Sequence, residues 1–156
     1  MIRVQPEDFD VGAEIAALTG GNHRIGGLAV FVGLVRDMAG EEAIGAMTLE
    51  HYPGMTEKEL ARIEEEAKQR WPLEASLIIH RIGRLEPGDR IVLVLTASAH
   101  RQAAFDACQF LIDWLKTKAP FWKQEETAGG PRWVEARDSD GEAAGRWRKR
   151  DPDAAE

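Results

Sequence analysis

The feature that most constrains the fold of this chain is an amphipathic segment near its middle. The apolar side chains of the segment recur at every third or fourth residue, the spacing with which one helix face packs against a core. They are Ala104, Phe105, Cys108, Leu111, Ile112 and Leu115. Pro120 cannot continue a helix, because proline lacks a backbone N–H and clashes with the preceding turn. The pattern therefore predicts one buried helix that begins near residue 100 and ends near residue 118.

Basic residues stand at both ends of this predicted helix. His100 and Arg101 lie at its start, where unpaired backbone N–H groups favour a bound anion. Lys116 and Lys118 lie at its end, where lysine complements the helix dipole, and Lys123 follows in an aromatic-rich segment. The two ends serve either separate surfaces or, through folding or dimerisation, a single pocket.

The rest of the chain predicts strand pairs that alternate with single helices. Helices are expected over residues 6–18 and 56–71, and strands over residues 2–5, 26–36, 44–52, 77–82, 90–98, 121–126 and 132–136. This order is typical of an α+β fold with a mixed or largely antiparallel sheet, and we expect the helices on one face. One domain is expected over residues 1–147, followed by a charged tail, residues 148–156, that we expect to be disordered.

Local patterns add expectations about individual residues. Thr56 is expected to cap the helix over residues 56–71, with Met55 facing the core and Glu64 facing solvent. Gly33, inside an apolar strand, indicates a bulge or a close approach of backbone.

Composition and charge exclude several classes of protein. Lys and Arg number 20 against 27 Asp and Glu, giving a net charge of −7, so we expect no nucleic-acid partner. The longest apolar runs, 28–35 and 91–97, are too short to span a bilayer, and no apolar signal region opens the chain. Cys108 is the only cysteine, which points to a buried structural thiol in a reducing cytoplasm.

No metal or nucleotide motif is present in the sequence. The four histidines share no ligand spacing, and neither a Walker loop nor a Gly-x-Gly-x-x-Gly sequence appears, so we expect no metal and no cofactor. The candidates for chemistry are basic residues at the ends of elements: Arg36, His100, Arg101, Lys116, Lys123 and Arg137. In an acidic chain, such a set favours a small anionic ligand or the anionic end of a peptide.

These residues also have structural interpretations, which stay open at this point. Arg36 can pair with a surface acid, His100 can cap a helix, and Lys116 can complement a helix dipole. Lys123 can cover apolar surface with its aliphatic stem. Spacing alone therefore makes an anion site plausible and leaves its substrate open.

Six short stretches, taken together, carry a family resemblance. They are Phe31-Val-Gly-Leu-Val-Arg36, Leu49-Glu-His-Tyr-Pro-Gly-Met55, His80-Arg-Ile-Gly83, Ser98-Ala-His-Arg101, Leu115-Lys-Thr-Lys-Ala-Pro-Phe-Trp-Lys123 and Trp133-Val-Glu-Ala-Arg137. In this order they resemble the MoaE family, the large, catalytic subunits of molybdopterin synthase. The resemblance covers roughly residues 1–147.

The resemblance implies a fold, a set of partners and a reaction. The fold is an α/β hammerhead with a small additional antiparallel β subdomain, within the α+β class. The partners are a second copy of the chain and a small ubiquitin-like sulfur carrier subunit, which together form a heterotetramer. The implied activity is sulfur transfer from the carrier's C-terminal thiocarboxylate to cyclic pyranopterin monophosphate (precursor Z), which yields molybdopterin for molybdenum cofactor biosynthesis.

The same resemblance implies roles for individual residues. Lys116 is the leading catalytic residue and Lys123 the second; a lysine beside the thiocarboxylate can stabilise charge, transfer a proton or bond covalently to the carrier's carbonyl. The implied substrate-binding residues are Arg36, His100, Arg101, Arg137, Phe31 and Met55, of which the last two line an apolar wall. Both substrate phosphate and thiocarboxylate are anionic, so directed cationic donors in a partly dry site suit them.

Two rival functions remain open beside this one. One is a non-catalytic module that docks the Gly-Gly tail of a ubiquitin-like protein and uses its basic pocket only as a carboxylate clamp. The other is a metal-free hydrolase that binds a phosphate ligand.

Overall fold

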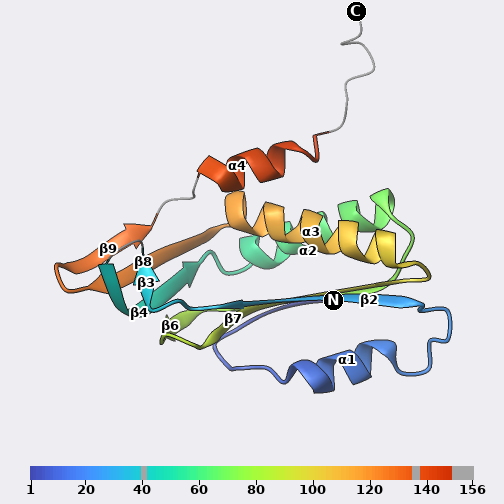
Figure 1. The fold of residues 1–156 in the computed structure, drawn as a ribbon, viewed down its shortest axis with the longest axis horizontal. Helices are drawn as coiled ribbons and strands as arrows, with labels where there is room; N and C mark the ends of the chain where they lie inside the picture. The colour runs from blue at the N-terminus through green and yellow to red at the C-terminus, as the bar shows by residue number, and fades with distance from the viewer. Residues whose placement is uncertain (40–41, 135–137, 149–156) are drawn as a thin grey trace, which may run out of the picture.

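The computed structural model describes residues 1–39, 42–134 and 138–148. Within these residues the chain forms two β-sheets and four helices (Figure 1). The elements are β1 (Ile2–Gln5), α1 (Val11–Thr19), β2 (Gly27–Leu34), β3 (Met38–Ala39), β4 (Glu42–His51), α2 (Met55–Arg70), β5 (Leu73–Arg81), β6 (Gly83–Leu85), β7 (Arg90–Ser98), α3 (Arg101–Thr117), β8 (Phe121–Thr127), β9 (Gly130–Val134) and α4 (Asp138–Gly145). The α+β class is confirmed.

The central sheet has four strands in the order β1-β5-β7-β2. β7 runs antiparallel to both of its neighbours, and β1 runs parallel to β5, so the sheet is mixed as predicted. Gly33 in β2 marks the expected irregularity: the register shifts after it, and an added Cβ would lie 2.7 Å from a methyl carbon of Val92. Gly33 is thus needed for the close approach of β2 and β7.

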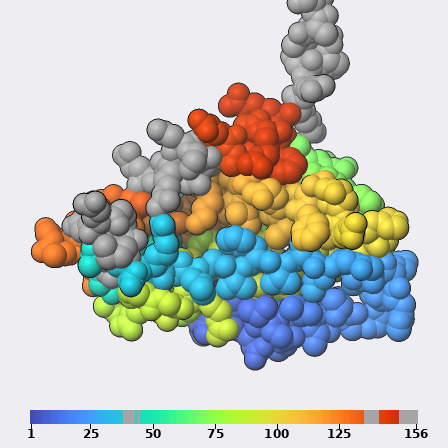
Figure 2. Space-filling model, viewed as in Figure 1, coloured from blue at the N-terminus to red at the C-terminus, as the bar shows by residue number. Residues whose placement is uncertain are grey.

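Helices cover both faces of the central sheet, and the prediction that they share one face is wrong. α1 packs on one face, against Leu77, Ile79 and Leu93, while α2 and α3 pack on the other, against Ile78 and Val94. Because β5 and β7 carry apolar side chains at both odd and even positions, each face needs a cover. In the space-filling view, α3 fills the layer between β2 and α4 (Figure 2).

The second sheet is wholly antiparallel and lies at the end of the molecule where α3 ends (Figure 1). Its strands follow the order β3-β4-β8-β9, and β6 also pairs with β4. It has a small core of its own, made of Val35, Met47, Leu49, Leu85 and Ile91. The short strands β3 and β6, and the helix α4, were not predicted from the sequence.

α3 matches the predicted helix closely. His100 is its N-cap and Lys118 is its C-cap. Like the other helices in the described part of the chain, α3 is not long and apolar enough to cross a membrane. Phe105 is the exception to the predicted apolar stripe, since 60% of its side chain is exposed. Side chains three and four residues apart share a helix face, and the buried face of α3 includes Ala104, Ala107, Leu111 and Trp114. Phe105 lies beside this row.

The start of α2 differs from the prediction. Gly54, with a φ of +84°, is the N-cap, and its backbone N–H donates to Glu57 Oε2 at 2.8 Å. Thr56, the predicted cap, is buried inside the first turn, and its hydroxyl donates to the carbonyl oxygen of Tyr52 at 2.8 Å. Only the second half of a capping box therefore exists, two residues nearer the N-terminus than predicted, because Gly54 has no side chain to accept from the helix.

Two further side chains of α2 face opposite to their predicted directions. Met55 is exposed, because it lies in the first turn and precedes the buried face of the helix. Glu64 is buried, because it accepts a hydrogen bond from Ser76 Oγ at 2.5 Å and pairs with the amino group of Met1. α1 begins at Val11, rather than at residue 6, because Asp10 caps it by accepting from the Ala13 N–H.

Candidate active site

Two predicted catalytic residues lie near His80, where the two sheets adjoin. Lys116 lies in the last turn of α3, and Lys123 lies on β8, the strand that follows α3. Both are close enough to His80, at the end of β5, for their positive charges to lower its pKa. One helix and one strand from each sheet therefore build the site.

The register of β8 fixes the face on which Lys123 lies. Lys123 pairs directly with Leu49 of β4, and Phe121 pairs with His51. Side chains two residues apart point to the same face of a strand, and direct cross-strand partners share that face. Lys123, Phe121 and His51 thus face the same side of the second sheet.

Two histidines stack on the ring of Phe121. The His80 ring lies parallel to it, with centroids 3.8 Å apart and an interplanar angle of 15°. The His51 ring is also stacked, at 6.5 Å and 27°. The three rings, contributed by β5, β8 and β4, join the central sheet to the second sheet beside the two lysines.

His80 is neutral in this setting. Burial, together with the charges of Lys123, Lys116 and His51, lowers the pKa of His80 to about 3, although the hydrogen bond to the Arg81 carbonyl acts in the opposite direction. The Nδ1 atom lies 2.8 Å from that carbonyl oxygen, which can only accept. The proton is therefore on Nδ1, and Nε2 carries a free lone pair.

Sequence reasoning assigned no role to His51 or His80. Both lie inside stretches that carry the family resemblance, His51 as the last residue of β4 and His80 one residue before the end of β5. His80 directly follows the apolar run Leu77–Ile79, and a polar residue at the end of such a run was the signal that could have identified it, whereas His51 follows Glu50 and gave no such signal.

Arg36 and Met55 lie at the same end of the molecule as the lysines. Arg36 is exposed and follows Val35, whose side chain packs with Leu49 in the core of the second sheet. Met55 is 52% exposed at the start of α2, just after β4. Phe31 lies within β2 and packs, partly buried, against the core beneath α3.

His100 and Arg101 lie at the opposite end of α3. Fifteen residue steps of about 1.5 Å separate Arg101 from Lys116, or about 22 Å along the helix axis. The start of α3 contacts the start of β2, since an added Cβ on Gly27 would lie 3.1 Å from the Arg101 Cα atom. A single copy of the chain therefore does not bring His100 and Arg101 to the lysine pair. Arg137 lies outside the described residues.

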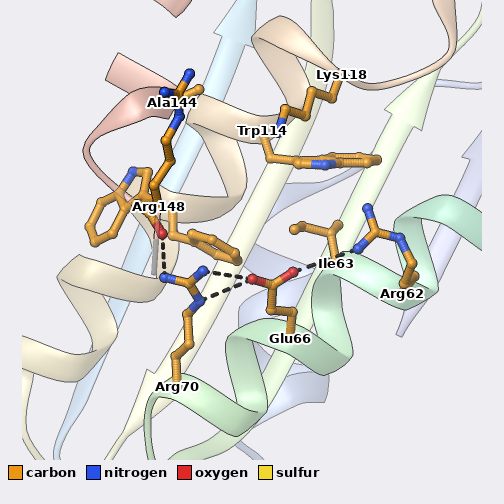
Figure 3. A pocket seen from close by; sticks show the side chains of 10 residues that line it. Arg62, Ile63, Glu66, Arg70, Trp114, Lys118, Ala144 and Arg148 are labelled. Atoms are coloured by element: carbon orange, nitrogen blue, oxygen red, sulfur yellow. Dashed lines mark hydrogen bonds and ion pairs between the residues drawn. The ribbon is translucent and has the colours of Figure 1, made fainter. Parts of the chain in front are cut away.

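A separate cleft of about 170 Å³ opens between α2, α3 and α4 (Figure 3). Its lining is basic and aromatic: Arg62, Arg70, Lys118, Arg148, Phe110, Trp114 and Trp147, with Glu66 as its carboxylate. Glu66 pairs with Arg70 at 2.7 Å and with Arg62 at 3.6 Å. Lys118 lines this cleft, so its surroundings differ from those of Lys116.

The cleft anchors the segment that follows α4. Arg70 donates to the carbonyl oxygen of Trp147 at 2.7 Å, and the Trp147 indole N–H donates to Asp113 Oδ2 at 2.6 Å. The Trp147 ring also meets Trp71 and Phe110 edge-on, at 5.5 Å and 5.7 Å. These contacts account for the buried Asp113 on α3 and give the cleft a structural role.

Two other groups were considered for chemistry. Cys108 is buried, and burial raises the pKa of its thiol to about 11, so it is not a thiolate near neutral pH. Across the described parts of the chain, no group of three His, Cys, Asp or Glu side chains is placed to hold a metal ion.

Comparison with known proteins gives consistent matches. The family described as MoaE protein matches residues 4–118. A molybdopterin synthase catalytic subunit from Pseudomonas aeruginosa is 62% identical over 146 residues, which cover 94% of this chain and 97% of that protein. A solved MoaE protein of molybdopterin biosynthesis from Burkholderia ambifaria has a TM-score of 0.81 at 54% identity, covering 94% of this chain and 97% of that one. A molybdopterin synthase structure from Staphylococcus aureus has a TM-score of 0.79 at 31% identity, covering 85% and 96%.

Proposed function

Because the chain belongs to the MoaE family, we propose that it is a sulfurtransferase that converts precursor Z to molybdopterin. The sulfur comes from the C-terminal thiocarboxylate of a small ubiquitin-like carrier subunit. The observation that supports this most directly is that Lys116 and Lys123 both lie close enough to the buried His80 for their charges to lower its pKa. The resemblance assigns the chemistry to these two lysines, and they come from separate elements to one place.

Charge explains what this pair does in the reaction. Precursor Z carries an anionic cyclic phosphate, and the carrier tail carries an anionic thiocarboxylate. Ammonium groups beside a partly buried wall stabilise such anions, and the charge that develops as sulfur transfers, more than they would in water. Lys116 acts beside the thiocarboxylate, and Lys123 supports the developing charge.

The substrate-binding residues divide between two copies of the chain. Arg36 and Met55 lie at the same end of one copy as the lysines, and Phe31 lies in the middle of β2, whereas His100 and Arg101 lie about 22 Å from Lys116. A homodimer can bring the start of one α3 to the lysine pair of the other copy, where Arg101 binds the phosphate through its planar guanidinium. One carrier bound to each copy completes a heterotetramer.

Three accompanying expectations stay predictions. They are the hammerhead arrangement of the fold, a single domain over residues 1–147, and a location in the cytoplasm, where the Cys108 thiol stays reduced. Of the tail over residues 148–156, only Arg148 lies within the described part of the chain.

The test is a reconstituted reaction of the purified chain with thiocarboxylated carrier and precursor Z. We expect Lys116→Ala to leave the protein folded and to lower turnover by at least about 100-fold, the cost of removing one group that stabilises developing charge. Lys118→Ala is the matched control, because Lys118 is near the same helix end but lines the other cleft, and it should stay within about twofold of wild type.

The same reaction separates the rival functions. A docking module binds plain carboxylate and thiocarboxylate tails equally and makes no molybdopterin. A hydrolase releases product from precursor Z without any carrier. Wild-type turnover by Lys116→Ala would reject the proposed catalytic role.

A further inference from the structure

The lysine site contains a buried polar group to which the proposed chemistry gives no task. His80 is 5% exposed, one residue before the end of β5, and it directly follows the buried apolar run Leu77–Ile79. It lies on the same face of β5 as Ile78, the face that α2 and α3 cover. A neutral apolar residue would fill this position at lower cost, because burying a polar ring requires compensating contacts.

Two contacts fix the orientation of the His80 ring. The parallel stack on Phe121, with centroids 3.8 Å apart, sets the plane of the ring. The hydrogen bond from Nδ1–H to the Arg81 carbonyl oxygen, at 2.8 Å, sets its rotation within that plane. Together they fix the direction in which the Nε2 lone pair points.

His51 also stacks on Phe121, at the greater centroid distance of 6.5 Å, and a hydrogen bond fixes its orientation as well. The Thr56 hydroxyl uses its only proton to donate to Tyr52 O, so it accepts from His51 Nδ1, 3.3 Å away. Each histidine therefore donates its Nδ1–H to a nearby oxygen, His80 to the Arg81 carbonyl and His51 to the Thr56 hydroxyl. Two rings built alike around Phe121 indicate an arrangement that serves the site as well as the core.

The charged groups that act on His80 are Lys123 on β8, Lys116 on α3 and His51 on β4, in decreasing order of effect. Lys123 also shares the inner face of β8 with Phe121, the residue on which His80 stacks. An uncharged acceptor beside an ammonium group orients it without neutralising it, so the full positive charge stays available to an anionic substrate.

We propose that His80 is a positioning residue for Lys123, and that its Nε2 accepts a hydrogen bond from the Lys123 ammonium group and directs that charge towards the bound thiocarboxylate and phosphate. The inference rests on the proposed sulfur transfer. His80 itself touches neither substrate nor carrier. Its neutrality matters, because a protonated ring would repel the ammonium group that it orients.

Kinetics of two His80 variants test the proposal. His80→Phe keeps a ring to stack on Phe121 and removes both nitrogens, whereas His80→Gln keeps a side-chain acceptor. We expect His80→Phe to lower kcat by about 10- to 100-fold, the range for losing one hydrogen bond to a charged group, with KM for precursor Z changed by less than about threefold. His80→Gln should recover part of that loss, and the control His23→Phe, at an exposed loop position, should match wild type.

Nuclear magnetic resonance provides a readout that does not depend on activity. Imidazole nitrogen shifts of the full chain should show His80 protonated on Nδ1 only, with no titration between about pH 5 and 9. The Lys123 Nζ resonance should shift in His80→Phe and return towards its wild-type position in His80→Gln.

The outcomes separate this inference from the proposed function. An inactive wild-type protein would overturn the proposed function. The His80 tautomer and the Lys123 Nζ resonance, both measured by nuclear magnetic resonance, would then still test the contact between the two side chains. An active wild type with a His80→Phe variant of unchanged kcat would overturn the positioning role alone. Equal losses in His80→Phe and His80→Gln, with an unmoved Lys123 resonance, would assign His80 to packing only and would also reject the proposal.

Discussion

The two ends of α3 carry similar basic residues in very different surroundings. At its start, His100 and Arg101 are exposed, and His100 makes no side-chain capping hydrogen bond. At its end, Lys116 is also exposed, but it and the partly buried Lys123 lie near a buried, neutral His80 that stacks on Phe121. A cation at a helix end is a common sequence pattern, and the difference between these two ends comes from what packs beside them.

This contrast indicates a division of labour between the two ends. A site that stabilises developing charge needs groups whose positions are fixed before the reaction, and the end of α3 supplies them through β5 and β8. A site that binds a phosphate can use exposed cations that close on the ligand, as the start of α3 offers.

The largest effect is expected at the end of α3. Lys123→Ala should lower kcat by about 100- to 1000-fold, because it removes a cation that acts on the developing charge. Steady-state kinetics with the reconstituted carrier measure it, and Lys118→Ala supplies the reference. An increase in KM with unchanged kcat would instead assign Lys123 to substrate binding, and would contradict the proposed difference between the two ends of α3.

The second effect is a pH dependence of stability that we expect for His80, near the end of α3, and not for His100, at its start. The pKa of His80 is lowered from 6.5 to about 3 in the folded chain, so between these pH values the unfolded chain binds a proton that the folded chain does not. The stability that His80 contributes is complete above pH 6.5 and is lost as the pH falls towards 3. Denaturant unfolding should therefore show a loss of about 1.5 kcal/mol from pH 6.5 to 5 that His80→Phe abolishes.

His100→Phe is the control for that pH dependence. His100 is exposed, so its replacement should leave the loss of stability between pH 6.5 and 5 unchanged. If the two variants behave alike, His80 is not the buried neutral group described here.

The third effect is structural and lies at the start of α3. Gly26→Ala would place a Cβ 2.2 Å from the carbonyl oxygen of Ala99, so the backbone just before α3 must move. We expect a loss of about 1 to 3 kcal/mol in unfolding free energy, the range for forced overpacking, together with weaker precursor Z binding. Gly141→Ala, which meets open space, should not destabilise the protein. Normal stability in Gly26→Ala would show that the start of α3 is not held against β2.

The smallest effect is expected for an exposed cation at the start of α3. Arg101→Ala should raise KM for precursor Z by about tenfold and change kcat little, because it removes a charge-assisted contact made before and during the reaction alike. Titration of substrate at saturating carrier measures this. A loss in kcat as large as that of Lys123→Ala would contradict the division between the two ends.

The sequence predicts those parts of the fold that depend on local patterns. The bounds of α3 follow from the apolar spacing and Pro120, and both flanking strands, β7 and β8, were expected within about one residue. α4 was missed because its sequence has no apolar stripe, and β6 because it has only three residues. The helices on both faces follow from the continuous apolar strands, a consequence that the one-face prediction overlooked.

The site was predicted through resemblance, and its geometry depends on contacts distant in sequence. His80 owes its place to Phe121, 41 residues later, and Glu64 is buried because Ser76 reaches it from β5. Neither partnership leaves a local pattern. Similarly, spacing placed His100 and Lys116 at opposite ends of one helix and left open whether they share a pocket.

A purified mixed dimer tests most directly whether the two ends of α3 form one site across two copies. One copy carries Lys116→Ala, the other carries Arg101→Ala, and two different affinity tags isolate the heterodimer. A symmetric dimer then has one site with both substitutions and one with neither, so we predict turnover of about half the wild-type value at limiting substrate, above that of either parent homodimer. A heterodimer no more active than the mean of its two parents would contradict the shared site.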